Sequence, residues 1–433
     1  MFGVTAMVIQ AKEFLPLIAL NVHLCVAMEY RTVIILLNFV QGRFIRPSLI
    51  YKIQFMNYRV VMFLLLLTAC SSSHTEESAS GVSHSTESKE IFIPLAKKEY
   101  FSVEDMFSEY HYVQLETNDR CLLPGSDELM RILVDKEGKI YIGCLHKVFV
   151  FGPDGQFRWV LDRKGDGPES YAHLWNFQVW DNGDISVLQV CSRVTTYSKD
   201  GKFISNHSFG DLRLQDMACL GDSLMLLRWS KQGLFDHLYY VADRYTGELK
   251  NSYWHLKEVS KLIYGMRTFF YRYDGKLLYH DYQQNDVYEL YADTAIVRYR
   301  INVDNRIPPE GYWARPNMSS RQLFDDYAQS DYIGHIPCYV ESDSLIFLRF
   351  EGGRKDLMAY AAIDKKTWKS RLMKRLIFDD RFNLEPEIVF SLQDGWCIIV
   401  LYPNEILTNP LFAARFPGLN EESNPVLFIG KLK

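Results

Sequence analysis

The chain has 433 residues, with 48 Lys and Arg against 53 Asp and Glu and a formal net charge of -5 at pH 7. It carries no basic stripe, so nucleic acid is not an expected partner. None of its eight cysteines stands in a Cys-x-x-Cys pair or at the Cys and His spacing of a metal site. The composition therefore predicts no metal and no cofactor.

A signal-like sequence lies some way into the chain. Met56-Asn-Tyr-Arg59 is followed by the apolar run Val60–Leu67 and by Thr68-Ala-Cys70. A basic residue, an apolar run and small residues before a cleavage point are typical of a secretory signal. Because such signals stand at the start of a chain, we interpret residues 1–55 as a mis-annotated upstream extension. The alternative is an N-terminal membrane anchor.

Leu67-Thr-Ala-Cys70 matches the bacterial lipobox, in which the cysteine thiol receives a diacylglycerol. The alternative is a buried strand that ends in Cys, but the Ser-rich residues 71–81 that follow cannot pack. We therefore expect a lipoprotein signal peptide over residues 56–69, lipidation at Cys70, a tether over 70–90 and a folded domain over 91–433.

Six times in the folded domain, a short apolar run is broken by a tight turn and then resumed. The turns are centred on Gly138, Gly183, Gly221, Gly275, Asp343 and Gly395. They are about 45, 38, 54, 68 and 52 residues apart, as expected when each unit is one propeller blade. A second hairpin follows within a unit, as at Gly152-Pro-Asp-Gly155 and Ser198-Lys-Asp-Gly201. Two hairpins supply four antiparallel strands.

The sequence thus predicts an all-β fold, a six-bladed β-propeller of four-stranded antiparallel blades; a β-sandwich or open barrel is the alternative. The sixth unit lacks one strand, because only Pro425–Gly430 follows its first hairpin. An unpaired edge would expose ladder groups. We expect an N-terminal strand at about residues 110–116 to close this last blade.

Two stretches depart from the strand pattern. Met318–Ala328 reads as a short helix capped by Ser319 or Ser320, and residues 402–423 form a long insertion. Long loops in a compact domain usually carry function. A third irregular segment is the loop over residues 163–175. We expect at least two of these three segments to share one face and form a concave site with exposed Tyr or Trp.

Four segments of the chain carry a family resemblance: Tyr112–Thr117, Arg131–Ile142, Val148–Phe157 and Asp162–Tyr171. They resemble the six-bladed β-propeller lipoproteins of Bacteroides and its relatives, which are distantly similar to NHL-repeat propellers. The resemblance covers roughly residues 100–433. It implies the fold and an envelope location, and very little chemistry. With the lipobox, it predicts an outer-membrane lipoprotein of a Gram-negative bacterium, attached through its lipid, on either the periplasmic or the surface side.

The loop between the first two predicted blades concentrates charged and aromatic residues. Its candidate ligand-binding residues are Arg163, Asp166, Glu169, Tyr171 and Trp175. The alternative, which the sequence favours, is that the glycines and Pro168 only shape an inter-blade connection. The related family tends to read Gly-Pro-Gly-Glu-Tyr, where this chain has Gly167-Pro-Glu-Ser-Tyr171; the lost glycine weakens the case for a close ligand approach.

No catalytic motif is recognisable, neither a Gly-x-Ser-x-Gly elbow nor His-Glu-x-x-His, so catalytic residues stay unknown. Cysteines in strand-like runs are expected as buried free thiols, while Cys121 and Cys338 could pair. Most of the 27 Tyr, 27 Phe and 8 Trp are expected to pack between blades, although exposed ones could stack on sugars.

We predict a ligand-binding or protein-scaffolding module, with glycan capture as one use and a glycan or a protein as partner. The alternative is a propeller enzyme, of the glycan lyase or hydrolase type, with its site at the channel mouth. Desolvated carboxylates or His converging from several blades would favour the enzyme. A channel neutralised by Arg or Lys would favour binding.

Overall fold

The computed structural model describes residues 88–433 except 126–128, 145, 190–191, 230–236, 257–269, 281–284 and 388, together with five strands nearer the N-terminus. The chain divides into two compact units, Met1–Ser78 and Ala79–Lys433. The first contains an antiparallel sheet in the order β1 (Met7–Gln10), β2 (Val22–Glu29), β3 (Thr32–Phe39) and β4 (Ile50–Lys52). The predicted signal peptide and Cys70 lie outside the described residues.

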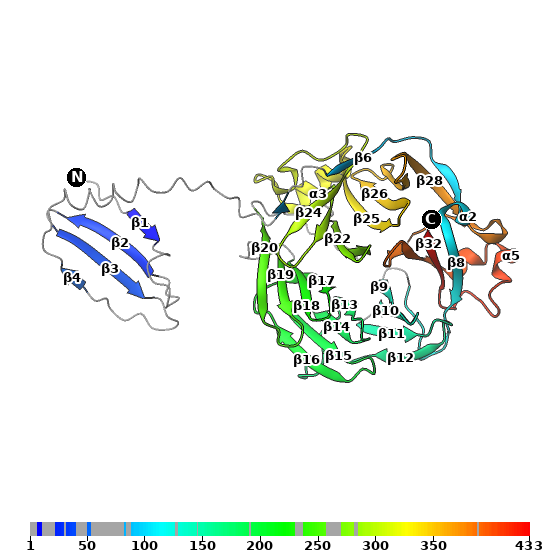
Figure 1. The fold of residues 1–433 in the computed structure, drawn as a ribbon, viewed down its shortest axis with the longest axis horizontal. Helices are drawn as coiled ribbons and strands as arrows, with labels where there is room; N and C mark the ends of the chain where they lie inside the picture. Colours follow the sequence, from blue (N-terminus) through cyan, green and yellow to red (C-terminus); the bar gives the residue numbers. More distant parts are fainter. Residues whose placement is uncertain are drawn as a thin grey trace. The chain divides into compact units, whose positions relative to one another are not determined.

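The second unit is a ring of six antiparallel sheets, which confirms the predicted six-bladed propeller (Figure 1). Blade 1 consists of β9 (Leu129–Val134), β10 (Ile140–Cys144), β11 (Lys147–Phe151) and β12 (Phe157–Leu161). Blade 2 consists of β13 (Asn176–Val179), β14 (Ile185–Gln189), β15 (Arg193–Tyr197) and β16 (Phe203–Ser208). Blade 3 consists of β17 (Leu214–Leu220), β18 (Leu224–Trp229), β19 (His237–Asp243) and β20 (Leu249–His255).

The other three blades follow the same order from the inside outwards. Blade 4 consists of β21 (Phe270–Tyr273), β22 (Lys276–His280), β23 (Asp286–Leu290) and β24 (Ala295–Val303). Blade 5 consists of β25 (Ile333–Glu341), β26 (Leu345–Gly352), β27 (Met358–Asp364) and β28 (Ser370–Ile377), with the short β29 (Asn383–Leu384) after it. Blade 6 consists of β30 (Val389–Ser391), β31 (Trp396–Leu401), β32 (Val426–Leu432) and β8 (Phe107–Gln114).

The six predicted turns are the hairpins between the first and second strands of the blades. Five of the six central residues are glycines with positive φ, between 62° at Gly221 and 85° at Gly183, a backbone region that favours glycine. Since every innermost strand runs in the same direction, all six hairpins lie on one side of the ring, which we call the turn face. The innermost strands begin on the opposite side, which we call the loop face.

The N-terminal strand β8 closes the ring, as predicted, although it spans Phe107–Gln114. It pairs antiparallel with β32, with Tyr112 opposite Phe428. Its end is fixed to blade 1, where the Glu116 backbone N–H donates to the Gly155 carbonyl at 2.9 Å. Gly155 has φ 77°, and a Cβ there would lie 2.2 Å from the Gln114 carbonyl oxygen, so only glycine allows so close an approach.

Two further N-terminal segments extend neighbouring blades, which the sequence analysis did not predict. The strands β5 (Val82–Ser83) and β6 (Lys89–Ile93) pair parallel with β24 at the outer edge of blade 4. The strand β7 (Glu99–Ser102) pairs parallel with β28 in blade 5, and the helical turn α2 (Val103–Met106) leads into β8. The last residues of the predicted tether, 82–83 and 89–90, therefore belong to strands.

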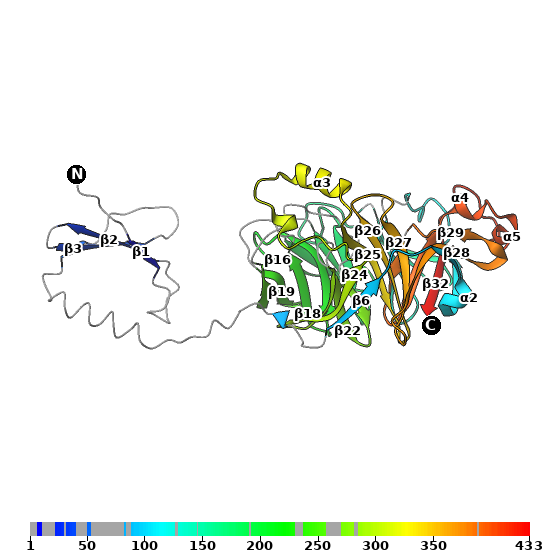
Figure 2. The same ribbon diagram turned by 90° about the horizontal axis from the view of Figure 1, so that it is seen from above.

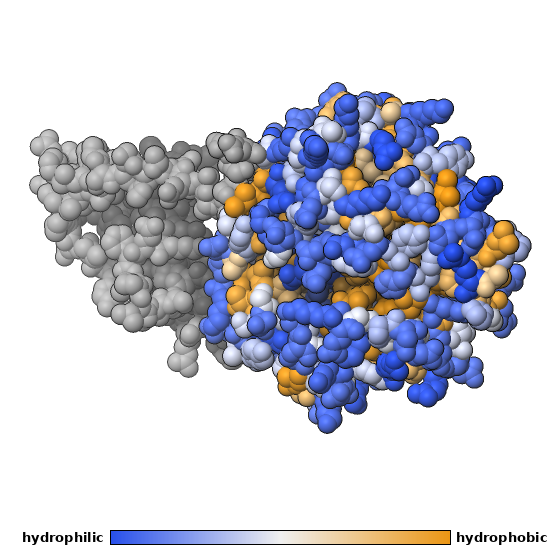
Figure 3. Space-filling view, turned by 45° about the vertical axis from the view of Figure 1, so that its right-hand side comes forward, coloured by the Kyte–Doolittle hydropathy of each residue, from blue (hydrophilic) through white to orange (hydrophobic). Residues whose placement is uncertain are grey.

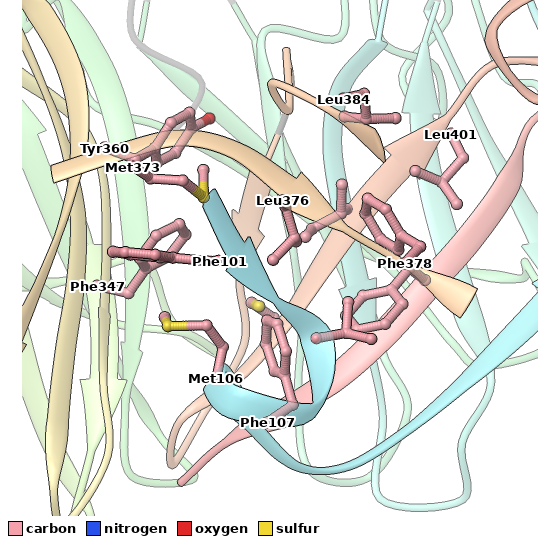
Figure 4. Close-up of a cluster of buried hydrophobic side chains, with 14 of the residues drawn as sticks. Phe101, Met106, Phe107, Phe347, Tyr360, Met373, Leu376, Phe378, Leu384 and Leu401 are labelled. Atoms are coloured by element: carbon pink, nitrogen blue, oxygen red, sulfur yellow. The ribbon is translucent and has the colours of Figure 1, made fainter. Parts of the chain in front are cut away.

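The core lies between adjacent blades, as six hydrophobic clusters of residues from both neighbours. Figure 4 shows the cluster between blades 5 and 6, where Phe347 of β26 stacks on Tyr360 at 5.1 Å and Phe101 and Met106 reach in from the N-terminal segment. Most aromatic side chains are thus used in packing. The described cysteines are buried free thiols, Cys121 and Cys338 among them, in different clusters.

The insertion before blade 5 carries η2 (Tyr312–Ala314) and α3 (Ser320–Gln329). Ser319 caps α3 and forms a capping box with Gln322, as predicted for this helix. At Gly353 of blade 5 a Cβ would lie 1.6 Å from the Tyr327 carbonyl oxygen, so the helix sits directly on the blade. The other insertion forms α4 (Pro403–Ile406) and α5 (Pro410–Ala413). Figure 2 shows α3 and α4 on the same side of the ring.

Candidate functional site: the central cavity

The predicted ligand loop connects β12 to β13 on the loop face, and its Tyr171 is a structural residue. The side chain is fully buried, with its hydroxyl 2.7 Å from the His146 carbonyl and 3.1 Å from the Leu161 carbonyl. Burial raises the pKa of Tyr171 to about 12. The ring lies edge-to-face against Tyr197. Tyr171 therefore holds the loop against blades 1 and 2 rather than facing a ligand.

The other four predicted residues are exposed. Arg163 reaches the Gly201 carbonyl, and the Glu169 backbone carbonyl accepts from the Tyr197 hydroxyl at 2.8 Å. Trp175 donates its indole N–H to the Gln215 carbonyl at 2.9 Å and remains 44% exposed. These contacts shape the connection between blades 1 and 2, as the structural interpretation of the loop anticipated. Trp175 is the member that presents an open aromatic face.

The loop face carries all three irregular segments, because two connect blades and the third joins β31 to β32 at the same end. A pocket of about 660 Å³ there is lined within the insertion, between Pro309 and Tyr332. Its polar wall is the Arg315–Asp326 ion pair at 2.6 Å, to which the Tyr312 hydroxyl donates. These charged groups satisfy one another.

A different cavity, of about 300 Å³, lies inside the ring and opens among the first hairpins of the blades, on the turn face. The space-filling view shows a hollow near the middle of the ring, with hydrophobic residues visible between hydrophilic ones (Figure 3). The lining comes from the innermost hairpins of blades 1, 2, 3, 4 and 6. It includes Arg131, Lys136, Gln178, Asp181, Tyr271, Arg272 and Gln393. No single blade could form such a surface.

Arg131 of β9 anchors a buried polar cluster at this cavity. Its guanidinium donates to Asn176 Oδ1 at 3.0 Å and lies 3.4 Å from Asp216 Oδ1. Asn176 also donates to Asp216 at 2.7 Å. The Asp216 side chain is fully buried and that of Arg131 is 7% exposed. A buried carboxylate is thus paired with a cation two blades away.

Arg272 of β21 is the second guanidinium of the lining. One of its nitrogens donates to the Cys219 carbonyl at 2.5 Å. Its backbone is clamped from blade 6, since the Asp394 N–H donates to the Arg272 carbonyl at 3.2 Å and Asp274 N–H donates to Asp394 Oδ1 at 2.8 Å. Lys136 and Asp181 form a 2.6 Å ion pair at the exposed rim. Across the described chain, Arg272 is the lining cation for which no carboxylate forms an ion pair.

Tyr271, the residue before Arg272, is 5% exposed and its ring packs against Tyr339 at 5.7 Å. No residue in the described part of the chain forms a hydrogen bond with its buried hydroxyl. Burial raises the pKa of Tyr271 far above its ordinary value, so the hydroxyl stays protonated.

Sequence reasoning missed this cavity. Tyr271 and Arg272 belong to the run Phe269–Tyr273, interpreted as core packing, and Arg131 to a strand. The signal that could have found them is a charged residue inside an innermost strand, at Arg131, Asp216 and Arg272. Within the described part of the chain, no group of three or more His, Cys, Asp or Glu side chains is placed to hold a metal. The helices described there include none long and apolar enough to cross a membrane.

The chain belongs to the family described as Domain of unknown function (DUF4934), whose model matches residues 90–431. No curated protein matches the sequence. Among solved structures, it is similar to a "Putative exported protein" from Bacteroides fragilis NCTC 9343, with 18% identity and a TM-score of 0.66, over 79% of this chain and 99% of that one. That likeness shows the shared propeller fold.

The chain is also similar to the C-terminal WD40 domain of Sif2. The identity is 8% and the TM-score 0.37, over 73% of this chain and 84% of that one. At that TM-score the likeness carries no functional information.

Proposed function

We propose that this protein is an exported, lipid-anchored propeller of the outer membrane that binds a small ligand in its central cavity. The observation that carries the binding part is the cavity itself, whose lining is formed by residues of five blades and includes the guanidinium-bearing residues Arg131 and Arg272. Concave sites with a few converging polar groups are the usual form of small-ligand sites. At about 300 Å³, the cavity suits a ligand the size of one sugar or one small organic acid.

Two observations support the envelope location. Leu67-Thr-Ala-Cys70 has the order of residues of a lipobox, and the similar Bacteroides fragilis protein carries a name that refers to export. The folded domain would then be tethered to the membrane through Cys70, on the periplasmic or the surface side.

Binding rather than catalysis is favoured by the electrostatics of the cavity. The buried carboxylate of Asp216 pairs with Arg131, which lines the cavity, and Asn176 also donates to it. A carboxylate that accepts hydrogen bonds from two other blades is a structural group that joins blades 1, 2 and 3.

A thermal-stabilisation screen of neutral and acidic monosaccharides, oligosaccharides and small metabolites tests the proposal. We expect hits whose effect is lost in Gln178→Leu, which fills the cavity wall with an apolar side chain, and kept in Gln322→Leu, which lies on the insertion. A ligand that stabilises both variants to the same extent would show that its binding site lies outside the central cavity. The absence of any hit would leave a protein scaffold as the better account.

A further inference from the structure

We propose that the central cavity binds the carboxylate of a small organic acid, with Arg272 and Tyr271 as the groups that hold it. This inference rests on the proposed function and adds the chemical class of the ligand. It starts from two consecutive residues of β21, Tyr271 and Arg272. Each has a side-chain N–H or O–H group that forms no hydrogen bond with a described residue.

The first donor is the Arg272 guanidinium. A guanidinium presents five N–H donors in a planar fork that matches a carboxylate. The structure gives Arg272 one side-chain acceptor, the Cys219 carbonyl, and no carboxylate among the described residues forms an ion pair with it. Its side chain is only partly buried, so part of the fork can receive a ligand from the cavity.

The second donor is the Tyr271 hydroxyl, with which no described residue forms a hydrogen bond. Other atoms of Tyr271 line the cavity. The hydroxyl itself is closed off from solvent, so a ligand reaches it only after a small shift of the surrounding side chains. It is a neutral O–H rather than a phenolate, so it attracts an anion instead of repelling one. Its ring is held by Tyr339 and by the cluster between blades 4 and 5. A donor fixed in this way loses little freedom when a ligand binds.

The charges around the cavity also favour an anion. Arg272 lies close enough to Arg131 to help lower the pKa of that guanidinium, after the larger effects of burial, which lowers it, and of Asp216, which raises it. The carboxylates are already engaged by protein groups. Asp216 accepts from Arg131 and Asn176, and the lining residue Asp181 pairs with Lys136. Asp135, which also lines the cavity, accepts from two backbone N–H groups and from the Tyr141 hydroxyl. A ligand carboxylate would compensate Arg272, the lining guanidinium with which no described carboxylate forms an ion pair.

The position of Arg272 is fixed by backbone contacts between blades 4 and 6 as well as by the hydrogen bond of its side chain. The Arg272 backbone forms a bridge with Gln393 of blade 6, and Asp394 and Asp274 add hydrogen bonds on either side. The backbone of blade 4 around Arg272 is therefore bonded to blade 6 as well as to its own blade. Binding an anion should tighten this contact and stabilise the ring.

The test uses D-glucuronate, D-galacturonate and succinate, with the neutral methyl ester of each and inorganic phosphate as comparisons, on the full folded domain. We expect at least one carboxylate to raise the melting temperature and to bind by calorimetry, while its ester and phosphate bind at least about tenfold more weakly. Arg272→Gln and Tyr271→Phe should each weaken the carboxylate about tenfold. The control Arg321→Gln, on the exposed face of α3, should bind like the wild type.

Equal binding of acid and ester, equal binding of phosphate, or a carboxylate that binds Arg272→Gln unchanged would each overturn the proposal. If neutral ligands from the screen bind in the cavity and these carboxylates do not, the ligand class is wrong and the proposed function stands. If nothing binds in the cavity, both fail. Each variant is first compared with the wild type by its far-ultraviolet circular dichroism, which Tyr271→Phe should leave unchanged because no hydrogen bond is lost.

Discussion

Arg131 of blade 1 and Asp216 of blade 3 form an ion pair at 3.4 Å, and Asn176 of blade 2 bonds to both. Three consecutive blades are thus joined by side chains as well as by their hydrophobic clusters. Since both charged side chains are almost fully buried, this polar contact depends on all three blades being in place.

Removing one partner of that pair should be costly. Asp216→Asn leaves Arg131 buried without its counter-charge, and we expect a loss of about 3–5 kcal/mol in the free energy of unfolding. Urea denaturation measures it. The matched control is Asp181→Asn, which breaks the exposed pair with Lys136 and should have no measurable effect. Similar losses in both variants would show that the pair is not effectively buried.

Two buried tyrosines should respond in opposite ways to loss of the hydroxyl. Tyr339 donates to Glu341 Oε2 at 2.7 Å, so Tyr339→Phe should destabilise the fold by about 1–3 kcal/mol. Tyr271→Phe removes a hydroxyl without a partner and should leave stability equal or higher. Chemical denaturation of both variants in the absence of ligand checks this, and a large loss in Tyr271→Phe would mean that its hydroxyl has a structural bond.

Acid should remove the stability that Glu341 provides. Burial acts to raise the pKa of Glu341, but hydrogen bonds and charges from Arg298 and Lys365 outweigh it and hold the pKa below its ordinary value of 4.5. A depressed folded-state pKa means that the contribution is fully present above pH 4.5 and is lost as the pH falls through the folded pKa.

The free energies of unfolding of the wild type and Glu341→Gln should therefore differ most above pH 4.5 and converge below it. Denaturation curves from pH 3 to 7 measure the difference. The control is Glu137→Gln, whose carboxyl is exposed beside Lys139. A difference for Glu341→Gln that is constant over the whole range would contradict the assignment.

The closing strand should be essential. Deleting residues 110–116 removes most of β8, the fourth strand of blade 6, and should abolish cooperative thermal unfolding. A chain that starts at Lys89, and so keeps β6, β7 and β8, serves as the control and should melt like the parent domain. A deletion variant that melts like the parent would show that the ring closes without β8.

The lipid anchor has a direct test. Cys70→Ala should release the protein from the membrane fraction and stop the incorporation of labelled palmitate, whereas Ser72→Ala should change neither. Label that still enters Cys70→Ala would exclude this cysteine as the lipidated residue.

The blades could be predicted because their turn chemistry is local. Gly138 and Gly395 mark hairpins through their positive φ, and the missing strand of the sixth unit pointed to Tyr110–Leu115. The parallel strands β6 and β7 could not be foreseen in the same way, because a blade of four strands is complete without them. In retrospect, the buried pair Ile91 and Ile93 around the exposed Phe92 is the alternation of a half-buried strand.

The site was harder to predict because its residues are far apart in the chain. A loop such as Arg163–Tyr171 attracts attention by its composition, yet burial of Tyr171 makes it a packing residue. Arg131 and Arg272 each give only a weak signal, that of a charged residue inside a predicted innermost strand. Only ring closure brings them to one cavity, and that long-range arrangement leaves no local pattern.

The order of strands along the N-terminal segment has a mechanical consequence. A pull on the chain from its N-terminal side loads β5 and β6 first, then β7, and only then β8. The first three are additions to blades that already have four strands, so their detachment leaves the ring closed. Under a pulling force on such a tether, the edge strands would detach one after another. The force would reach β8, the strand that closes the ring, only after they had detached.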